Sequence, residues 1–170
     1  MTEKKTLPQE GVCYRFIPAK EERKLEAGLL RKMYFEIKLI RDFEARLLEL
    51  KDLGLVHGPC HSSIGQEGGA VGSIMALDKA DIIASTHRGH HHFLAKAFTA
   101  CLGFYDPIKA VPAGIQDILK TTLAEIMGLA QGYCRGRGGS MHLGNLDFGC
   151  LGTNAIVAGG VPIVTGVAWA

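Results

Sequence analysis

The sequence has little of three features that would mark a specialised protein class: paired cysteines, an excess of charge of one sign, and an apolar run free of breaks. Its 5 cysteines are widely spaced and none forms a Cys-x-x-Cys pair, which argues against a zinc ribbon or a thioredoxin-type motif. The net charge of +2 is too small to indicate binding to nucleic acid or to an anionic membrane. The remaining composition, 47% hydrophobic and 21% charged, is that of a globular domain.

Signals for export are also missing. The first residues lack the apolar core of a secretory signal, and Glu3 and Glu10 do not suit a transit peptide. The odd number of cysteines agrees with reduced thiols, so we expect a cytoplasmic protein. Residues 1–20 are polar and interrupted by prolines, and we expect them to form an extended or disordered arm.

Charge is absent from Cys150 to Ala170. A segment of this length can span a membrane. Its glycines and Pro162 break the apolar pattern, however, and favour a buried turn or strand followed by a close-packed helix that begins near Pro162. We therefore expect no membrane insertion.

The clearest secondary-structure signal predicts a long helix from about Glu21 to Leu53. Apolar residues recur at helical spacing throughout this range, and Gly54 is suited to end the helix. We expect the charged residues to fill the opposite face: Arg23, Lys32, Glu36, Arg41, Glu44, Arg46 and Glu49. Because the apolar stripe is wide enough for part of it to face another subunit, we expect an oligomer.

Shorter elements follow. Ser63 and Gln66 have the spacing of a capping box and predict a glycine-rich helix over 64–77, which requires close packing against another element. The other predicted elements are a short buried strand over 81–85, helices over 93–103 and 117–127, and a loop over 103–114.

The predicted strand runs into the segment Thr-His-Arg-Gly-His-His-His at 86–92. Ligand sites of α/β sheets lie beyond the carboxyl ends of strands, so this segment is a candidate site. An anion or phosphate site, a metal site and plain surface histidines are all compatible with it, although no carboxylate or cysteine is close in sequence to complete a metal site.

A second candidate segment reads Gln-Gly-Tyr-Cys-Arg-Gly-Arg-Gly-Gly-Ser-Met-His at 131–142. Glycine lets the backbone approach a ligand closely, and arginine offers planar donors to phosphate or carboxylate. The composition suits either a phosphate-binding loop or a flexible basic loop.

Four motifs occur in a recognisable order: His-Ser-Ser-Ile-Gly-Gln-Glu at 61–67, Thr-His-Arg-Gly-His at 86–90, Gly-Tyr-Cys-Arg-Gly-Arg-Gly-Gly-Ser-Met-His at 132–142, and Gly-Thr-Asn-Ala-Ile-Val at 152–157. In this order they resemble the alpha subunit of the thiamine-diphosphate-dependent 2-oxo acid dehydrogenases. That group includes pyruvate, branched-chain 2-oxo acid and acetoin dehydrogenases. The resemblance extends over about residues 25–170.

The resemblance implies an α/β thiamine-diphosphate-binding fold, in which an incomplete parallel sheet is flanked by helices and preceded by the long N-terminal helix. Residues 21–170 would then be the N-terminal portion of such a dehydrogenase domain. Relative to shorter family members, residues 98–116 look like an inserted surface excursion.

The same resemblance assigns roles to individual residues. His61 and His90 match histidines at the reaction centre of the family and are the candidate catalytic residues. Arg88 matches an arginine that binds the cofactor diphosphate. His87 stands beside it, where the family has either histidine or tyrosine.

Further cofactor contacts are implied near the end of the chain. The backbone of Val157 matches a contact to the aminopyrimidine ring, and Ala155 occupies a contact position where the family usually has glycine. The segment Ser140–His142 matches a wall of the site that shapes it more than it performs chemistry.

The implied activity is oxidative decarboxylation of a 2-oxo acid, with acyl transfer to a lipoyl group within a multi-enzyme complex. The implied cofactors are thiamine diphosphate and magnesium. The implied partners are a beta subunit, or a beta-like region of a fused chain, and a lipoyl acyltransferase. Acetoin cleavage is the alternative within the family.

One departure from the family concerns magnesium. The family binds it with a Gly-Asp-Gly motif and a downstream asparagine, but no Asp here is flanked by glycines and no acidic residue follows Asp147. We expect the ligands downstream of this chain and the chain alone to be inactive. A truncated, non-catalytic fragment or interaction module is the alternative from another class.

Overall fold

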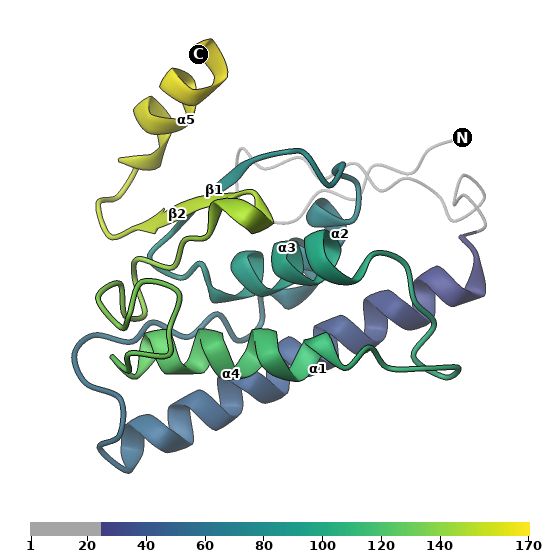
Figure 1. Cartoon of the computed structure of the whole chain (residues 1–170), viewed down its shortest axis with the longest axis horizontal. Helices are drawn as coiled ribbons and strands as arrows, with labels where there is room; N and C mark the ends of the chain where they lie inside the picture. The colour runs from purple at the N-terminus through teal and green to yellow at the C-terminus, as the bar shows by residue number, and fades with distance from the viewer. Residues whose placement is uncertain (1–24) are drawn as a thin grey trace, which may run out of the picture.

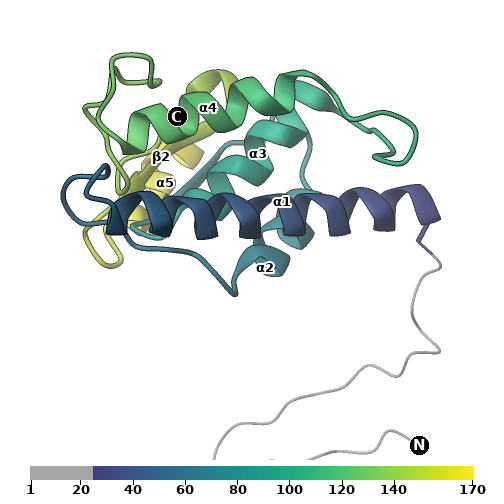
Figure 2. The same cartoon turned by 90° about the horizontal axis from the view of Figure 1, so that it is seen from below.

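The computed structural model describes residues 25–170, and the predicted arm over residues 1–20 lies outside this range. The elements are α1 (Ala27–Asp52), α2 (Glu67–Ile74), β1 (Ile83–Thr86), α3 (His90–Leu102), α4 (Gly114–Ile126), the short 3-10 helix η2 (Leu146–Phe148), β2 (Cys150–Asn154) and α5 (Gly160–Trp169). Helix α3 packs against α1, α2 and α4, and the two strands pair beside it (Figures 1 and 2). The predicted α/β class and the leading long helix are confirmed.

Helix α1 is the predicted long helix within the described residues, and Gly54 follows its last turn with a φ of +75°. The prediction that its charges fill the exposed face is confirmed for Arg41, Arg46 and Glu49 and was wrong for three others, while Arg23 lies outside the described residues. Lys32, Glu36 and Glu44 are buried, whereas the aromatic Tyr34 is 72% exposed. Lys32 Nζ lies 2.8 Å from Glu36 Oε1, so these two charges are buried as a pair.

The segment 103–113 joins α3 to α4 and is tied back to α1. The Tyr105 hydroxyl donates to Glu36 Oε1 at 3.1 Å, and Arg31 binds Asp106 through two hydrogen bonds of 3.0 and 2.5 Å. Of the predicted excursion over 98–116, only this middle part is a loop. The flanking residues belong to α3 and α4.

Helix α2 begins at Glu67 and is shorter than predicted. The capping-box prediction was wrong because the Ser63 hydroxyl donates to Glu44 on α1 at 2.9 Å and no side chain caps the helix. Arg41 of α1 instead fixes the start of α2 through a bidentate ion pair with Glu67, at 2.5 and 2.9 Å.

The glycines of α2 do not show the close packing that the sequence predicted. Ala70, Val71 and Ile74 are buried and pack towards α1 and α3. The opposite side of the helix carries the glycines, and a Cβ added at any of Gly68, Gly69 and Gly72 would meet no described atom within 4 Å.

Helix α3 supplies much of the core, with Phe93, Leu94 and Phe98 almost completely buried. It begins at His90, three residues earlier than predicted, so the last histidines of the 86–92 segment lie in its first turn and not in a loop. Lys96 is also fully buried, and its Nζ donates to the carbonyl oxygens of Asp78 and Lys79 at 3.1 Å each. These carbonyls replace the water that the ammonium loses.

The two strands form a parallel pair, with Thr86 opposite Asn154 at their carboxyl ends. Strand β1 begins two residues later than predicted and is only partly buried. Gly89 follows it at a close approach to β2, where a Cβ would lie 2.2 Å from Cγ2 of Thr153. Glycine therefore allows the segment after β1 to cross the end of the neighbouring strand.

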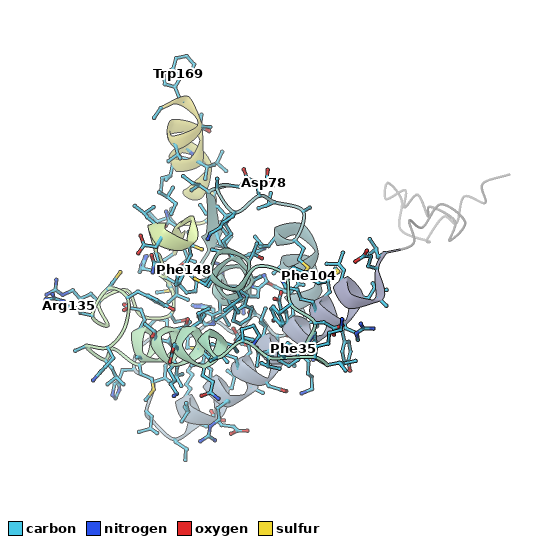
Figure 3. All side chains as sticks on the ribbon, turned by 45° about the vertical axis from the view of Figure 1, so that its right-hand side comes forward. Phe35, Asp78, Phe104, Arg135, Phe148 and Trp169 are labelled. Carbon is cyan, nitrogen blue, oxygen red and sulfur yellow. The ribbon has the colours of Figure 1, made fainter. Side chains whose placement is uncertain are left out.

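The glycine-rich loop over 132–138 is built around one carboxylate. The amides of Cys134 and Gly136 donate to Oε2 of Glu125 at 2.7 and 3.0 Å, and the amide of Gly138 donates to Oε1 at 2.7 Å. Glu125 belongs to α4 and is buried. These three amides are therefore already satisfied and are not available to phosphate, while Arg135 points away from the body (Figure 3).

Helix α5 follows β2 and stands apart from the other helices (Figure 1). It contacts β1, but none of its residues is buried, and Trp169 near its end is 92% exposed (Figure 3). The close packing predicted for this segment is thus absent among residues 25–170. Within the same range, no helix combines the length and apolar character needed to cross a membrane.

We predict that Arg41→Met lowers stability most at neutral pH. The hydrogen bond from Arg41 lowers the pKa of the buried Glu67 carboxyl from its ordinary value to about 2. A depressed folded-state pKa contributes stability above about pH 5, and the contribution is lost as the pH falls towards 2. Urea unfolding should show a loss of about 2 kcal/mol at pH 7 that shrinks with acidification.

Arg46→Met is the matched control for this test, because Arg46 pairs with Glu49 on the exposed side of α1. That exposed pair should contribute less than about 0.5 kcal/mol. Equal losses in both variants at every pH would contradict the assigned role of the Arg41–Glu67 pair.

We also predict that Glu125→Gln loosens the 132–138 loop. A carboxamide has one acceptor oxygen and must turn its NH2 group towards at least one of the three amides, which should cost about 2 kcal/mol. Hydrogen exchange at Cys134, Gly136 and Gly138 should accelerate, whereas the exposed control Asp117→Asn on the same helix should leave it unchanged. Unchanged protection in Glu125→Gln would exclude this carboxylate as the organiser of the loop.

Candidate active site

The candidate site lies at the carboxyl end of β1, where two loops distant in sequence meet. Arg88 follows β1, and its Nη1 donates to the carbonyl oxygen of Ser62 at 2.8 Å. This bond joins the 61–63 segment, which precedes α2, to the 87–89 segment, which connects β1 to α3. Two of the four motifs are thus brought into direct contact.

His61 and His87 extend this contact. Their rings pack edge to face with centroids 4.9 Å apart, and Nδ1 of His61 is buried without a hydrogen-bond partner. Burial lowers the pKa of His61, and the charges of His87 and Arg88 lower it further. A neutral imidazole with an unused nitrogen is suited to accept a proton from a bound ligand.

His90 lies beneath these residues and is fully buried. Its Nδ1 is 2.7 Å from Oε1 of Glu44, and its Nε2 is 2.9 Å from the hydroxyl and 3.1 Å from the carbonyl oxygen of Ser140. Both ring nitrogens therefore have protein partners. The implied role of His90 at the reaction centre stays a prediction.

Ser140 explains how the third motif belongs to this region. It is 5% exposed and connects the end of the glycine-rich loop to His90 at the start of α3. The structure thus places Ser140 beside a candidate catalytic residue, while the neighbouring Met141 and His142 are partly or fully exposed.

Ala155 and Val157 follow β2 at the same sheet edge as Arg88. Both are exposed, Val157 by 85%. Because Thr86 and Asn154 pair at the strand ends, the segments that carry Arg88 and Ala155 leave neighbouring strands on the same side. An open pocket lies here, and its lining includes Thr86, Asn154, Ile156, Ala158 and Val161.

The site has features that suit an anionic cofactor. Arg88 contributes a guanidinium group, and no side chain caps the amides in the first turn of α3 immediately after it. Uncapped amides at a helix start attract phosphate groups. The site is less suited to bind a metal ion, because residues 25–170 contain no group of three or more His, Cys, Asp or Glu placed to hold one.

Glu44 is the residue of this region whose burial the sequence pattern did not predict. The charged face assigned to α1 included it, yet it is fully buried and contacts both His90 and Ser63. A signal existed in the sequence: Ile40, Glu44 and Leu47 lie on one face of a helix, and the two apolar residues are buried. A carboxylate on such a face requires donors from another element.

Comparison with known proteins agrees with the order of the motifs. Residues 36–170 match the family model described as "Dehydrogenase E1 component". The alpha subunit of acetoin:2,6-dichlorophenolindophenol oxidoreductase from Bacillus subtilis is 40% identical over 136 residues, which are 80% of this chain and 35% of that protein. The corresponding subunit from Cupriavidus necator is 36% identical over 86% of this chain and 38% of its own length.

Pyruvate dehydrogenase subunits are similarly close. The E1 component subunit alpha from Zymomonas mobilis is 37% identical over 142 residues, which are 83% of this chain and 35% of that protein. The chain thus spans little more than a third of the length of these relatives. The resemblance stated from the motifs is confirmed, and the chain belongs to the dehydrogenase E1 component family.

Proposed function

We propose that this protein contributes the alpha-subunit part of a thiamine-diphosphate-dependent enzyme that oxidatively decarboxylates a 2-oxo acid and transfers the acyl group to a lipoyl group. The observation that carries the proposal is the convergence of His61, His87 and Arg88 at the carboxyl end of β1. Family membership and the pyruvate dehydrogenase relatives support it. The multi-enzyme complex, the beta subunit and a cytoplasmic location belong to the same proposal.

Each predicted site residue has a task in this proposal. Arg88 binds the diphosphate together with the amides at the start of α3, and His87 stands beside it. Bound thiamine diphosphate supplies the carbon nucleophile and the electron sink. His61 accepts or returns a proton at Nδ1, which has no protein partner but is buried, so this role requires Nδ1 to become accessible when the site is complete.

The remaining predicted residues orient the ligand. The backbones of Ala155 and Val157 face the aminopyrimidine ring, and the exposure of both residues leaves them accessible. His90 keeps its implied place at the reaction centre, which requires the buried ring to become accessible when the site is complete. The 140–142 segment forms a wall through the contact of Ser140 with His90.

Magnesium does not fit the described residues. A diphosphate needs a cation for neutralisation, yet residues 25–170 offer no cluster of metal-binding side chains. We therefore propose that the magnesium ligands lie in the part of the family fold that the matched segment does not cover, and that the beta subunit supplies the glutamate that activates the aminopyrimidine. The alpha-subunit relatives are almost three times as long as the matched segment, which leaves room for the magnesium ligands.

Acetoin cleavage is a second candidate, because the acetoin oxidoreductase subunits are 40% and 36% identical to this chain. Reduction of 2,6-dichlorophenolindophenol by the assembled enzyme, with pyruvate, branched-chain 2-oxo acids and acetoin as alternative substrates, separates the two activities. Turnover of none of them by the assembled enzyme, with the magnesium ligands and the beta subunit present, would favour the alternative of a non-catalytic interaction module.

We predict that Arg88→Ala weakens thiamine diphosphate binding by the assembled enzyme. Loss of charge-assisted hydrogen bonds to a phosphate should cost about 2 kcal/mol, which is roughly thirtyfold in affinity. Calorimetric titration measures the change, with the exposed Arg46→Ala on α1 as the control. Unchanged affinity in Arg88→Ala would remove Arg88 from the diphosphate site.

His61→Ala should lower turnover by a factor of about 100 or more while changing cofactor affinity much less, because proton transfer is lost but the diphosphate contacts remain. Since the pKa of His61 lies below its ordinary value, the neutral base persists into mildly acidic solution. The acidic limb of the kcat/KM profile of the unmodified enzyme should therefore lie below that of an ordinary histidine. Full activity of His61→Ala would refute the assigned role.

A further inference from the structure

Glu44 is the point where the elements of the candidate site are fastened to α1. Its carboxylate is 0% exposed and has three hydrogen-bond partners. The Ser63 hydroxyl donates to Oε1 at 2.9 Å, the Ser63 amide donates to Oε2 at 3.2 Å, and His90 Nδ1 lies 2.7 Å from Oε1. One side chain thus contacts both the segment before α2 and the first residue of α3.

The directions of these bonds are fixed by chemistry. Burial alone would raise the pKa of Glu44, but the bonds from His90 and Ser63 hold it below its ordinary value, so the group is ionised at neutral pH. An ionised carboxylate accepts hydrogen bonds and donates none. His90 must therefore carry a proton on Nδ1, which leaves Nε2 directed at Ser140.

We propose that Glu44 is the positioning residue of the site: it fixes the proton of His90 on Nδ1 and, through Ser63, holds the segment that carries His61 and the Arg88 acceptor. This inference deepens the proposed function and rests on it for its catalytic meaning. Glu44 touches neither His61 nor Arg88 and acts on both through the backbone of residues 61–63.

Glu44 is connected to Arg88, the proposed diphosphate-binding residue, through two successive contacts. Ser63 is held by two bonds to the carboxylate, and the adjacent Ser62 offers its carbonyl oxygen to Arg88 at 2.8 Å. Displacement of Ser63 therefore moves the acceptor that orients the Arg88 guanidinium. His61, next in the chain, moves with the same segment.

A glutamine at this position separates positioning from simple space filling. Glu44→Gln keeps the shape of the side chain but offers one acceptor oxygen to three donors. If its NH2 group faces His90, the imidazole must accept a hydrogen bond at Nδ1. The ring proton then moves to Nε2, which can donate a hydrogen bond to the Ser140 carbonyl oxygen. If the NH2 group faces the Ser63 amide instead, that amide loses its partner.

The test is a nitrogen NMR spectrum of the protein with 15N-labelled histidine rings, recorded in mildly alkaline solution, where an unperturbed histidine is neutral. The chain has 7 histidines, and the spectrum of His90→Gln identifies the signals of His90 by their loss. Glu49→Gln, an exposed carboxylate on the same helix, is the matched control. Glu44→Asp restores the charge on a shorter side chain.

The unmodified protein should show a proton on Nδ1 of His90, and a spectrum with the proton on Nε2 alone would overturn the proposal without any variant. In Glu44→Gln, either the proton should move to Nε2 or the Ser63 amide should lose its protection from hydrogen exchange. If Glu44→Gln keeps both the Nδ1 proton of His90 and the protection of the Ser63 amide, the proposal is also overturned. Glu49→Gln should change neither, and Glu44→Asp should return at least part of the Nδ1 signal.

Cofactor titration of the assembled enzyme then separates this proposal from the proposed function. Glu44→Gln should bind thiamine diphosphate roughly tenfold more weakly, the usual scale for removing a side chain that orients a ligand-binding residue. Glu49→Gln should bind it like the unmodified protein. Absence of binding by the unmodified protein would refute the proposed function, whereas the His90 spectrum would still report whether Glu44 fixes the ring.

Discussion

A carboxylate removed from water must be matched by donors, and this constraint organises most of the described chain. Four buried glutamates each fasten a different segment. Glu36 pairs with Lys32 and accepts a hydrogen bond from Tyr105, and Glu44 accepts hydrogen bonds from Ser63 and His90. Glu67 pairs with Arg41, and Glu125 accepts hydrogen bonds from the backbone amides of the glycine-rich loop. Apolar packing around α3 supplies the bulk of the core, while these carboxylates fix the positions of the segments that connect the helices.

The same constraint explains which parts of the fold could be predicted. Helical spacing predicted α1 and α4, and the order of the motifs predicted the family. Periodicity assigns every charge to the solvent, however, so it misplaced Lys32, Glu36 and Glu44. The capping box failed for a related reason: the Ser63 hydroxyl had a buried carboxylate as a competing partner, which lies 19 residues away in the sequence.

The sequence predicted which segments meet at the candidate site better than it predicted their contacts. The motifs named His61, His87 and Arg88, and the structure brings them together. The glycine-rich loop had the composition of a phosphate-binding loop, but Glu125 occupies the amides that a phosphate would use. A glycine-rich composition indicates that the backbone amides of a loop can be approached closely. Only the tertiary structure shows which acceptor they contact.

Exposed apolar side chains gather beside the candidate site. Ile156, Val157 and Val161 follow β2 at the sheet edge where Arg88 lies, and α5 continues the apolar surface to Trp169. Such surface favours association, since covering it removes apolar area from water. A polypeptide that covered α5 would also close the pocket between the strand ends and α5. One covering polypeptide would thus bury this apolar surface and part of the pocket lining together, which agrees with the proposed enzyme and its beta subunit.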